Sequence, residues 1–172
     1  LYVHLGNFGL AILTLTVIPG DDPLPEGFAM PLIQAAVRAV VQINAAGAGI
    51  RIKLVPTGPA DITIRPTALT EGSVLTEMPG FSGSGVMGVG YMTVWSNDDD
   101  IITEAVILIS TGILAEDLAS VVLEEITQSL GFLYDIDGPA YEGVSILSQG
   151  SNATTVIAGQ DAALLRLHYP PE

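Results

Sequence analysis

The sequence has no cysteine, only two histidines and only five basic residues, and each shortage excludes a class of site. Without cysteine there are no disulfides, no thiolate metal sites and no cysteine nucleophile. The histidines, His4 and His168, stand near opposite ends of the chain, so the sequence offers no local histidine cluster for zinc. Five basic residues against 19 acidic ones cannot build the surface that nucleic acids or anionic membranes need. The formal charge of −14 therefore excludes nucleic acid as a partner.

Long apolar runs are also missing. The best candidate, residues 10–18, is shorter than the roughly 20 residues that a membrane helix needs, and its threonines alternate with apolar residues at strand period. We predict a strand there, as a possible extra N-terminal element, and no transmembrane segment. Apolar residues make up 49% of the chain and charged residues 14%, which indicates a folded protein. We expect a single domain over residues 1–172.

Hydrophobic periodicity predicts helices and strands in a mixed order. The helices are expected at residues 31–46, 114–130 and 159–167. The strands are expected at residues 10–18, 50–55, 61–65, 89–95 and 105–110. Pro31 suits the first position of its helix, and Glu116 and Asp117 suit the first turn of the second helix.

Two segments between these elements are rich in turn residues. Residues 66–88 carry many glycines, serines, threonines and prolines, and we expect a long surface loop there. The glycine run at residues 80–90 holds no lysine and opens no helix, so it does not indicate a nucleotide-binding loop. Residues 132–156 are expected to form a second loop.

The helix expected at residues 114–130 places a carboxylate in the middle of its apolar face. At 100° per residue Glu125 falls among the apolar side chains, while Glu124 and Gln128 lie along one edge. A buried carboxylate is costly unless it is paired, protonated or metal-bound. Three interpretations stay open for Glu125: a hydrogen bond that fixes the following loop through Ser145, Tyr134 or a backbone N–H, an oxygen-ligated metal, or residual catalysis.

The same helix resembles the zinc-binding helix of the metzincins. In that family H-E-x-x-H-x-x-G-x-x-H aims three histidines at one zinc ion and the glutamate at the metal-bound water. This sequence has Glu124, Glu125, Gln128, Gly131 and Tyr134 at the same spacing. Only the glutamate and the glycine match.

The resemblance, strongest to the matrixin-like branch, covers about residues 31–170. Residues 60–64 (ADITI) are similar to the A-D-I-x-I strand of matrixins, residues 145–147 (SIL) to their S-I-M turn, and residues 161–169 to their closing helix. The strings EEITQSLGFLYD and QDAALLRLHYPP resemble more closely a family of uncharacterised exported bacterial proteins in which E-E-x-x-Q replaces H-E-x-x-H. The resemblance implies an exported, periplasmic or extracellular protein. It also implies an α+β, metzincin-like fold with a mixed, mostly parallel twisted sheet, a backing helix, the motif helix and a short C-terminal helix.

Carried over by position, the metal-ligand positions fall on Glu124, Gln128 and Tyr134, and the general base on Glu125. This donor set does not favour zinc, and without a metal nothing lowers the pKa of an attacking water. We therefore expect a catalytically degenerate domain that acts as an exported binding or structural subunit, with a protein partner or another copy of itself. The alternative is a metallopeptidase-like hydrolase with non-histidine ligands and Glu125 as general base.

Two acidic clusters are candidates for calcium, which prefers oxygen ligands from one bent loop. One comprises Asp135, Asp137 and Glu142, and the other comprises residues 98–100 with Glu104. The cluster that begins at Asp135 is not an EF-hand loop, because the position eleven beyond Asp135 holds Ile146 rather than glutamate. The competing interpretation is that both clusters are solvated surface loops.

Overall fold

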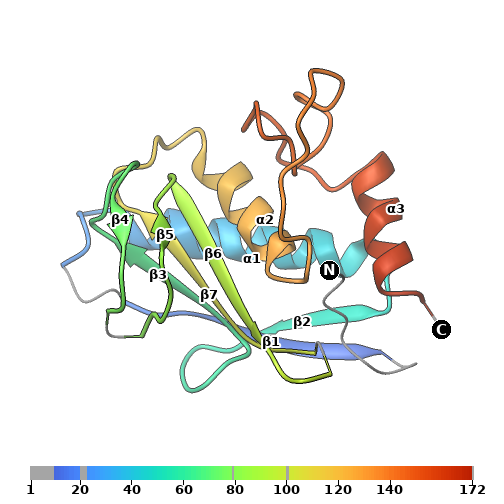
Figure 1. The fold of residues 1–172 in the computed structure, drawn as a ribbon, viewed down its shortest axis with the longest axis horizontal. Helices are drawn as coiled ribbons and strands as arrows, with labels where there is room; N and C mark the ends of the chain where they lie inside the picture. The colour runs from blue at the N-terminus through green and yellow to red at the C-terminus, as the bar shows by residue number, and fades with distance from the viewer. Residues whose placement is uncertain (1–9, 20–22, 79, 100, 172) are drawn as a thin grey trace.

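The computed structural model describes residues 10–19, 23–78, 80–99 and 101–171, which form a five-stranded sheet, a two-stranded hairpin and three helices (Figure 1). His4 and Asp100 lie outside the described residues. The elements in chain order are β1 (Ala11–Val17), α1 (Ala29–Ala45), β2 (Ile50–Leu54), β3 (Ile62–Thr67), β4 (Val74–Leu75), β5 (Gly85–Val86), β6 (Gly90–Ser96), β7 (Ile102–Ser110), α2 (Leu118–Gln128) and α3 (Gly159–His168).

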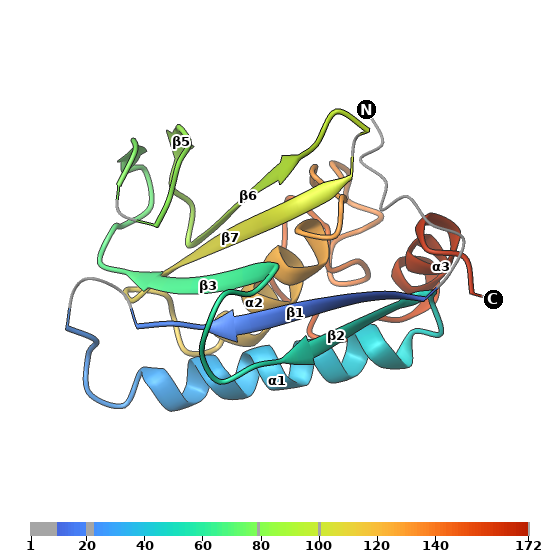
Figure 2. The same ribbon diagram turned by 90° about the horizontal axis from the view of Figure 1, so that it is seen from below.

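The sheet is mixed and mostly parallel, as the sequence predicted. Its strand order is β2-β1-β3-β7-β6, and only the edge strand β6 runs antiparallel to its neighbour. The segment that we expected as an extra strand forms β1 and lies inside the sheet, between β2 and β3. Helices α1 and α2 cover one face of the sheet, and α3 stands near the start of β2 (Figure 2). None of the helices in the described part of the chain has the length and apolarity to cross a bilayer.

The main core lies between the sheet and the two long helices. Small residues on α1, including Ala36 and Ala39, are fully buried and let α2 approach closely, so that Val122 and Ile126 of α2 reach the same cluster. Burying one large aliphatic side chain of this kind contributes about 1.5–3 kcal/mol. Because α2 is held against the sheet by this packing, the polar residues on its edge are presented beside β6.

Helix α2 begins later than the sequence indicated. It starts at Leu118, and residues 115–117 form a turn in which the Asp117 amide donates to the Leu114 carbonyl at 3.1 Å. Glu116 and Asp117 therefore precede the helix rather than occupy its first turn. The three-residue spacing of that hydrogen bond is tighter than an α-helix, which delays the helix start. By contrast, α1 begins earlier than expected, at Ala29, two residues before Pro31.

Residues 66–88 are more ordered than the expected surface loop. Strand β3 continues to Thr67, and the short strands β4 and β5 pair with each other. Leu75, Phe81 and Met87 are buried against β7 on the face of the sheet opposite the helices, where they form a second, smaller core cluster. The apolar residues of this segment are widely spaced among glycines, so no strand period was visible. The consequence is that both faces of β7 are covered.

The C-terminal segment fastens two distant parts of the fold. The Arg166 guanidinium donates to the Ala46 carbonyl at 2.8 Å, and the Gly49 amide donates to the Tyr169 carbonyl at 2.8 Å. The Tyr169 hydroxyl donates to the carbonyl of Leu130, just after α2. Burial raises the pKa of the Tyr169 phenol, so it stays protonated and able to donate. These hydrogen bonds tie the α1–β2 connection to the end of α2.

Replacing Tyr169 by phenylalanine is expected to lower the free energy of unfolding by about 1–2 kcal/mol, because the buried Leu130 carbonyl loses its donor. Urea denaturation followed by circular dichroism measures the change. Tyr134→Phe is the matched control, because the Tyr134 side chain is 80% exposed, and it should leave stability unchanged. Equal effects of the two substitutions would contradict the assigned role of the Tyr169 hydroxyl.

Candidate functional site

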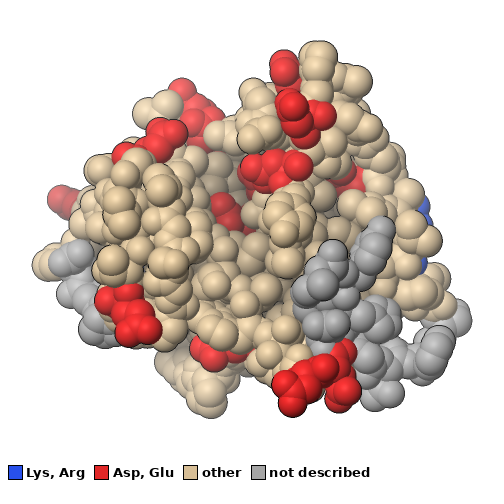
Figure 3. Space-filling model, viewed as in Figure 1, with Lys and Arg blue, Asp and Glu red and all other residues tan. Residues whose placement is uncertain are grey.

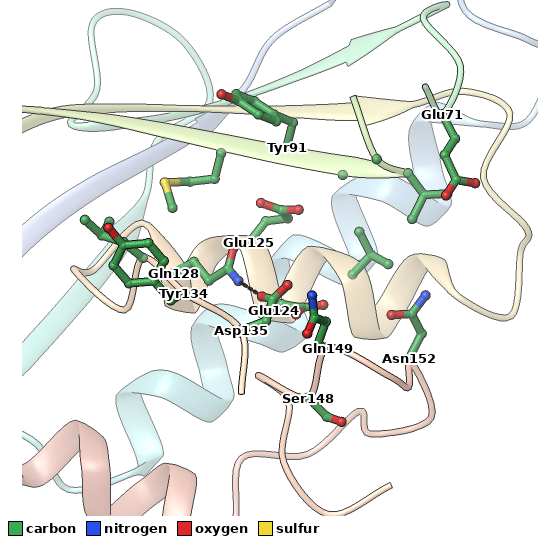
Figure 4. A pocket seen from close by; sticks show the side chains of 16 residues that line it. Glu71, Tyr91, Glu124, Glu125, Gln128, Tyr134, Asp135, Ser148, Gln149 and Asn152 are labelled. Carbon is green, nitrogen blue, oxygen red and sulfur yellow. Dashed lines mark hydrogen bonds between the residues drawn. The ribbon is translucent and has the colours of Figure 1, made fainter. Parts of the chain in front are cut away.

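A cavity of about 640 Å³ lies between the edge strand β6, helix α2 and the two loop segments that follow α2 (Figure 4). Its polar lining residues come from these elements and, in the case of Glu71, from the segment between β3 and β4. They are Glu71, Tyr91, Glu124, Glu125, Gln128, Tyr134, Asp135, Ser148, Gln149 and Asn152. The structure thus brings together the four positions of the motif helix and loop, Glu124, Glu125, Gln128 and Tyr134, around one cleft.

Glu125 lies at the junction of α2 and β6. Its side chain is only 8% exposed, as the helical periodicity predicted. Gly90 makes room for it, because a Cβ at position 90 would collide with Glu125 Oε1 and lie 2.7 Å from Val121 Cγ1. Glu125 Oε2 is buried and has no hydrogen-bond partner among the described residues. A buried polar atom in this state is costly, which marks the position as one that is not optimised for stability.

The expected partners of Glu125 are engaged elsewhere or exposed. The Ser145 hydroxyl donates to Asp161 Oδ1 at 2.6 Å, and Tyr134 stands at the rim of the cleft. The interpretation that Glu125 fixes the following loop through Ser145 or Tyr134 is therefore wrong. Asp161 of α3 fixes this loop instead, because its second oxygen, Oδ2, also accepts from the Ile146 amide at 3.0 Å. Ser145, Ile146 and Asp161 are all buried.

The carboxyl groups at the cleft bind protons more tightly than ordinary glutamates. Burial, and secondarily the negative charge of Asp135, raises the pKa of Glu124 to about 8. Burial also raises the pKa of Glu125 well above its usual range, with further contributions from Glu124 and Asp135. At neutral pH Glu124 is therefore mostly protonated in the free protein, and Glu125 holds its proton more tightly than an ordinary glutamate.

Gln128 lies on the helix edge beside Glu124, as expected. Its side-chain amide donates to Asp135 Oδ1 at 2.6 Å, which links α2 to the loop that follows it (Figure 4). Asp135 was considered in the sequence only as a calcium candidate. Among the described residues, no group of three or more histidine, aspartate or glutamate side chains is arranged to hold a metal ion. Asp135, Asp137 and Glu142 are thus not gathered into one site.

Residues 37–172 match the family described as "Protein of unknown function (DUF2927)". The chain belongs to this family. No match to the DUF2927 chain is found among curated proteins. Among solved structures it is similar to a crystal structure of myroilysin, with 11% sequence identity and a TM-score of 0.54, covering 98% of this chain and 86% of that one. A second myroilysin structure gives 11% identity and a TM-score of 0.47, covering 99% and 83%.

The likeness to the first myroilysin structure shows that the DUF2927 chain has a metzincin-like fold, which confirms the fold predicted from the sequence. Such a fold implies a zinc ion, and the residues at its ligand positions do not fit one. Zinc sites use imidazole or thiolate groups with at most one carboxylate. Here the Gln128 side-chain amide donates a hydrogen bond to Asp135, and the Tyr134 side chain is 80% exposed, so neither supplies an imidazole or thiolate ligand.

Two residues that shape the DUF2927 site were not recognised from the sequence. Gly90 stood in a glycine run that was assessed only for phosphate binding, although its position at the start of a predicted strand was a signal of close approach by another element. Asp161 was noted within the closing helix, but nothing local reveals that it reaches Ser145, 16 residues earlier. Both roles arise from contacts between elements.

Proposed function

We propose that this DUF2927 protein is a metzincin-like domain without zinc or peptidase activity that binds an extended segment of a protein partner along β6. The observation that carries the proposal is the position of β6. In the described sheet it pairs with β7 on one side and with no strand on the other. An open sheet edge binds extended peptides through main-chain hydrogen bonds. The cavity lies along this edge, so the side chains of a bound segment reach it.

The chemistry of the cleft supports binding rather than hydrolysis. A peptidase of this architecture needs a metal to activate water, because an unassisted water is far too weak an acid to lose its proton near neutral pH. Burial raises the pKa of Glu125, so its carboxyl group holds its proton more tightly than an ordinary glutamate and is less available to accept a proton from such a water. Export from the cytoplasm is part of the proposal and is supported by the resemblance to exported bacterial proteins. A second copy of the chain is the competing partner.

The absence of peptidase activity is tested with labelled casein and the purified protein, with zinc added and with a chelator. We expect no hydrolysis above background in any condition and no stoichiometric zinc by elemental analysis. Glu125→Gln should behave as the unchanged protein does. Chelator-sensitive hydrolysis that is lost in Glu125→Gln would overturn the proposal and favour a metallohydrolase with non-histidine ligands. Light scattering on the same sample reports whether the chain self-associates.

A further inference from the structure

We propose that the cleft beside β6 receives a cationic side chain, a guanidinium or ammonium group, from the extended segment that pairs with this strand. The inference rests on the proposed function, because the same bound segment supplies the side chain. It specifies the partner: a polypeptide with a basic residue at the position that faces α2.

The charge of the cleft is one-sided. Four acidic residues line it, Glu71, Glu124, Glu125 and Asp135, and no lysine, arginine or histidine stands among its described lining residues. Figure 3 shows acidic side chains within and around the hollow on this face, whereas lysine and arginine come into view only at the margin. A cation beside a carboxyl group favours its ionised form, so a partly enclosed site lined only by acidic groups attracts a positive charge even where burial keeps protons on the free side chains.

Negative charge alone would not distinguish this cleft from any other acidic patch. Glu125 distinguishes it, because this residue supplies a specific hydrogen-bond acceptor. It is 8% exposed, its Oε2 has no hydrogen-bond partner among the described residues, and it lines the same cleft. In Figure 4 its carboxyl group lies between α2 and β6, at the floor of the cleft. Guanidinium and ammonium groups are pure donors, and hydrogen bonds from them to carboxylates are among the strongest in proteins. A bound cation supplies the partner that Glu125 lacks.

The pleat of β6 brings a ligand side chain to this acceptor. Met92 and Val94 pack on the helix side of the sheet, whereas Tyr91 and Trp95 pack on the opposite side. Gly90 belongs to the helix side, since its missing Cβ would meet Glu125. Alternate side chains of a strand added beside β6 therefore project toward α2. Because Gly90 has no side chain, β6 does not block the path from a long basic side chain of the bound segment to Glu125.

The test compares capped eight-residue peptides of alternating valine and threonine that differ only at one central position. That position holds arginine, lysine, citrulline or glutamate, and binding is measured by fluorescence anisotropy with the full chain. Citrulline keeps the shape of arginine without its charge. We expect the arginine and lysine peptides to bind about tenfold more tightly than the citrulline peptide, and the glutamate peptide to bind more weakly still. Raising the salt concentration should reduce the difference.

Variants of the cleft locate the effect. Glu125→Gln and Glu124→Gln should each reduce the preference for arginine over citrulline to about twofold or less. Glu116→Gln is the matched control: Glu116 is exposed, lies outside the cleft, and should leave the preference unchanged. Circular dichroism verifies that each variant is folded. If one of the two cleft variants does not fold, the other still tests the assigned site.

The outcomes separate the inference from the function on which it rests. If all four peptides bind equally, the cationic preference is wrong while strand binding stands. If Glu116→Gln reduces the preference as much as Glu125→Gln does, the attraction is a property of the whole acidic surface and the assigned site is wrong. If none of the peptides binds, the proposed function fails, and the inference fails with it.

Discussion

Replacing Asp161 by alanine is expected to lower the free energy of unfolding by about 3 kcal/mol and the melting temperature by roughly 10 °C. Asp161 is 3% exposed and accepts hydrogen bonds from the Ser145 hydroxyl and the Ile146 amide. Its loss leaves both donors buried without a partner, and each such group costs about 1–3 kcal/mol. The Ser145 hydroxyl in turn accepts from the Leu147 amide at 3.1 Å, so the turn loses its anchor as a whole.

Thermal and urea denaturation measure this effect, and Asp137→Ala is its control. Asp137 is exposed and lies in the loop between α2 and α3, which also contains the turn at residues 145–147. Its replacement should change the free energy of unfolding by less than about 0.5 kcal/mol. Ser145→Ala should fall between the two, because the Ile146 amide keeps its acceptor. A loss below about 1 kcal/mol in Asp161→Ala would show that the turn at residues 145–147 is held by packing alone.

The free energy of unfolding is expected to fall by about 3 kcal/mol as the pH rises from 5 to 8. Burial raises the pKa of Glu124 from 4.5 to about 8 and that of Glu125 well above 4.5. Below pH 4.5 both groups are protonated in the folded and the unfolded chain, so neither contributes a penalty. Above pH 4.5 the unfolded chain releases these protons while the folded chain still binds them. The free energy of unfolding therefore falls with rising pH until the pH passes the pKa values of the folded state.

Melting temperatures at intervals between pH 5 and pH 8 measure this slope, and three variants assign it. Glu124→Gln and Glu125→Gln should flatten the dependence and melt at a higher temperature than the unchanged protein at pH 8. Glu116→Gln makes the same chemical change at an exposed site and should keep the original slope. Stability that is constant or rises over this interval would mean that the two carboxyl groups ionise normally in the folded chain.

Helical periodicity predicted the part of the site that lies on one element. It placed Glu125 on the buried face of α2 and Glu124 and Gln128 on its edge, and their observed burial agrees. A single helix fixes these directions through its 100° rotation per residue. The start of α2 was missed because the tight turn before Leu118 carries the same kinds of residue as a first helical turn.

The rest of the site depends on contacts between distant segments, which no local pattern encodes. Gly90 faces Glu125 across 35 positions of the sequence, and Asp135 holds Gln128 from the following loop. Tyr134 matches the spacing of a third metal ligand, yet the loop leaves it 80% exposed. The resemblance to metzincins supplied the fold because it covered most of the chain, whereas the partners of each polar side chain required the three-dimensional structure.

The attachment of α3 also has a consequence for the order of folding. Arg166 and Ala46 are 120 residues apart, and Gly49 is hydrogen-bonded to Tyr169 over the same interval. Closing so long a loop costs conformational entropy before the contacts between its ends can form. Structures rich in contacts between distant residues therefore fold slowly. During synthesis, the connection between α1 and β2 is completed only after residue 169 has left the ribosome. Until then the sheet and α2 can cover the apolar face of α1, but the end of this helix lacks its attachment to the C-terminal segment.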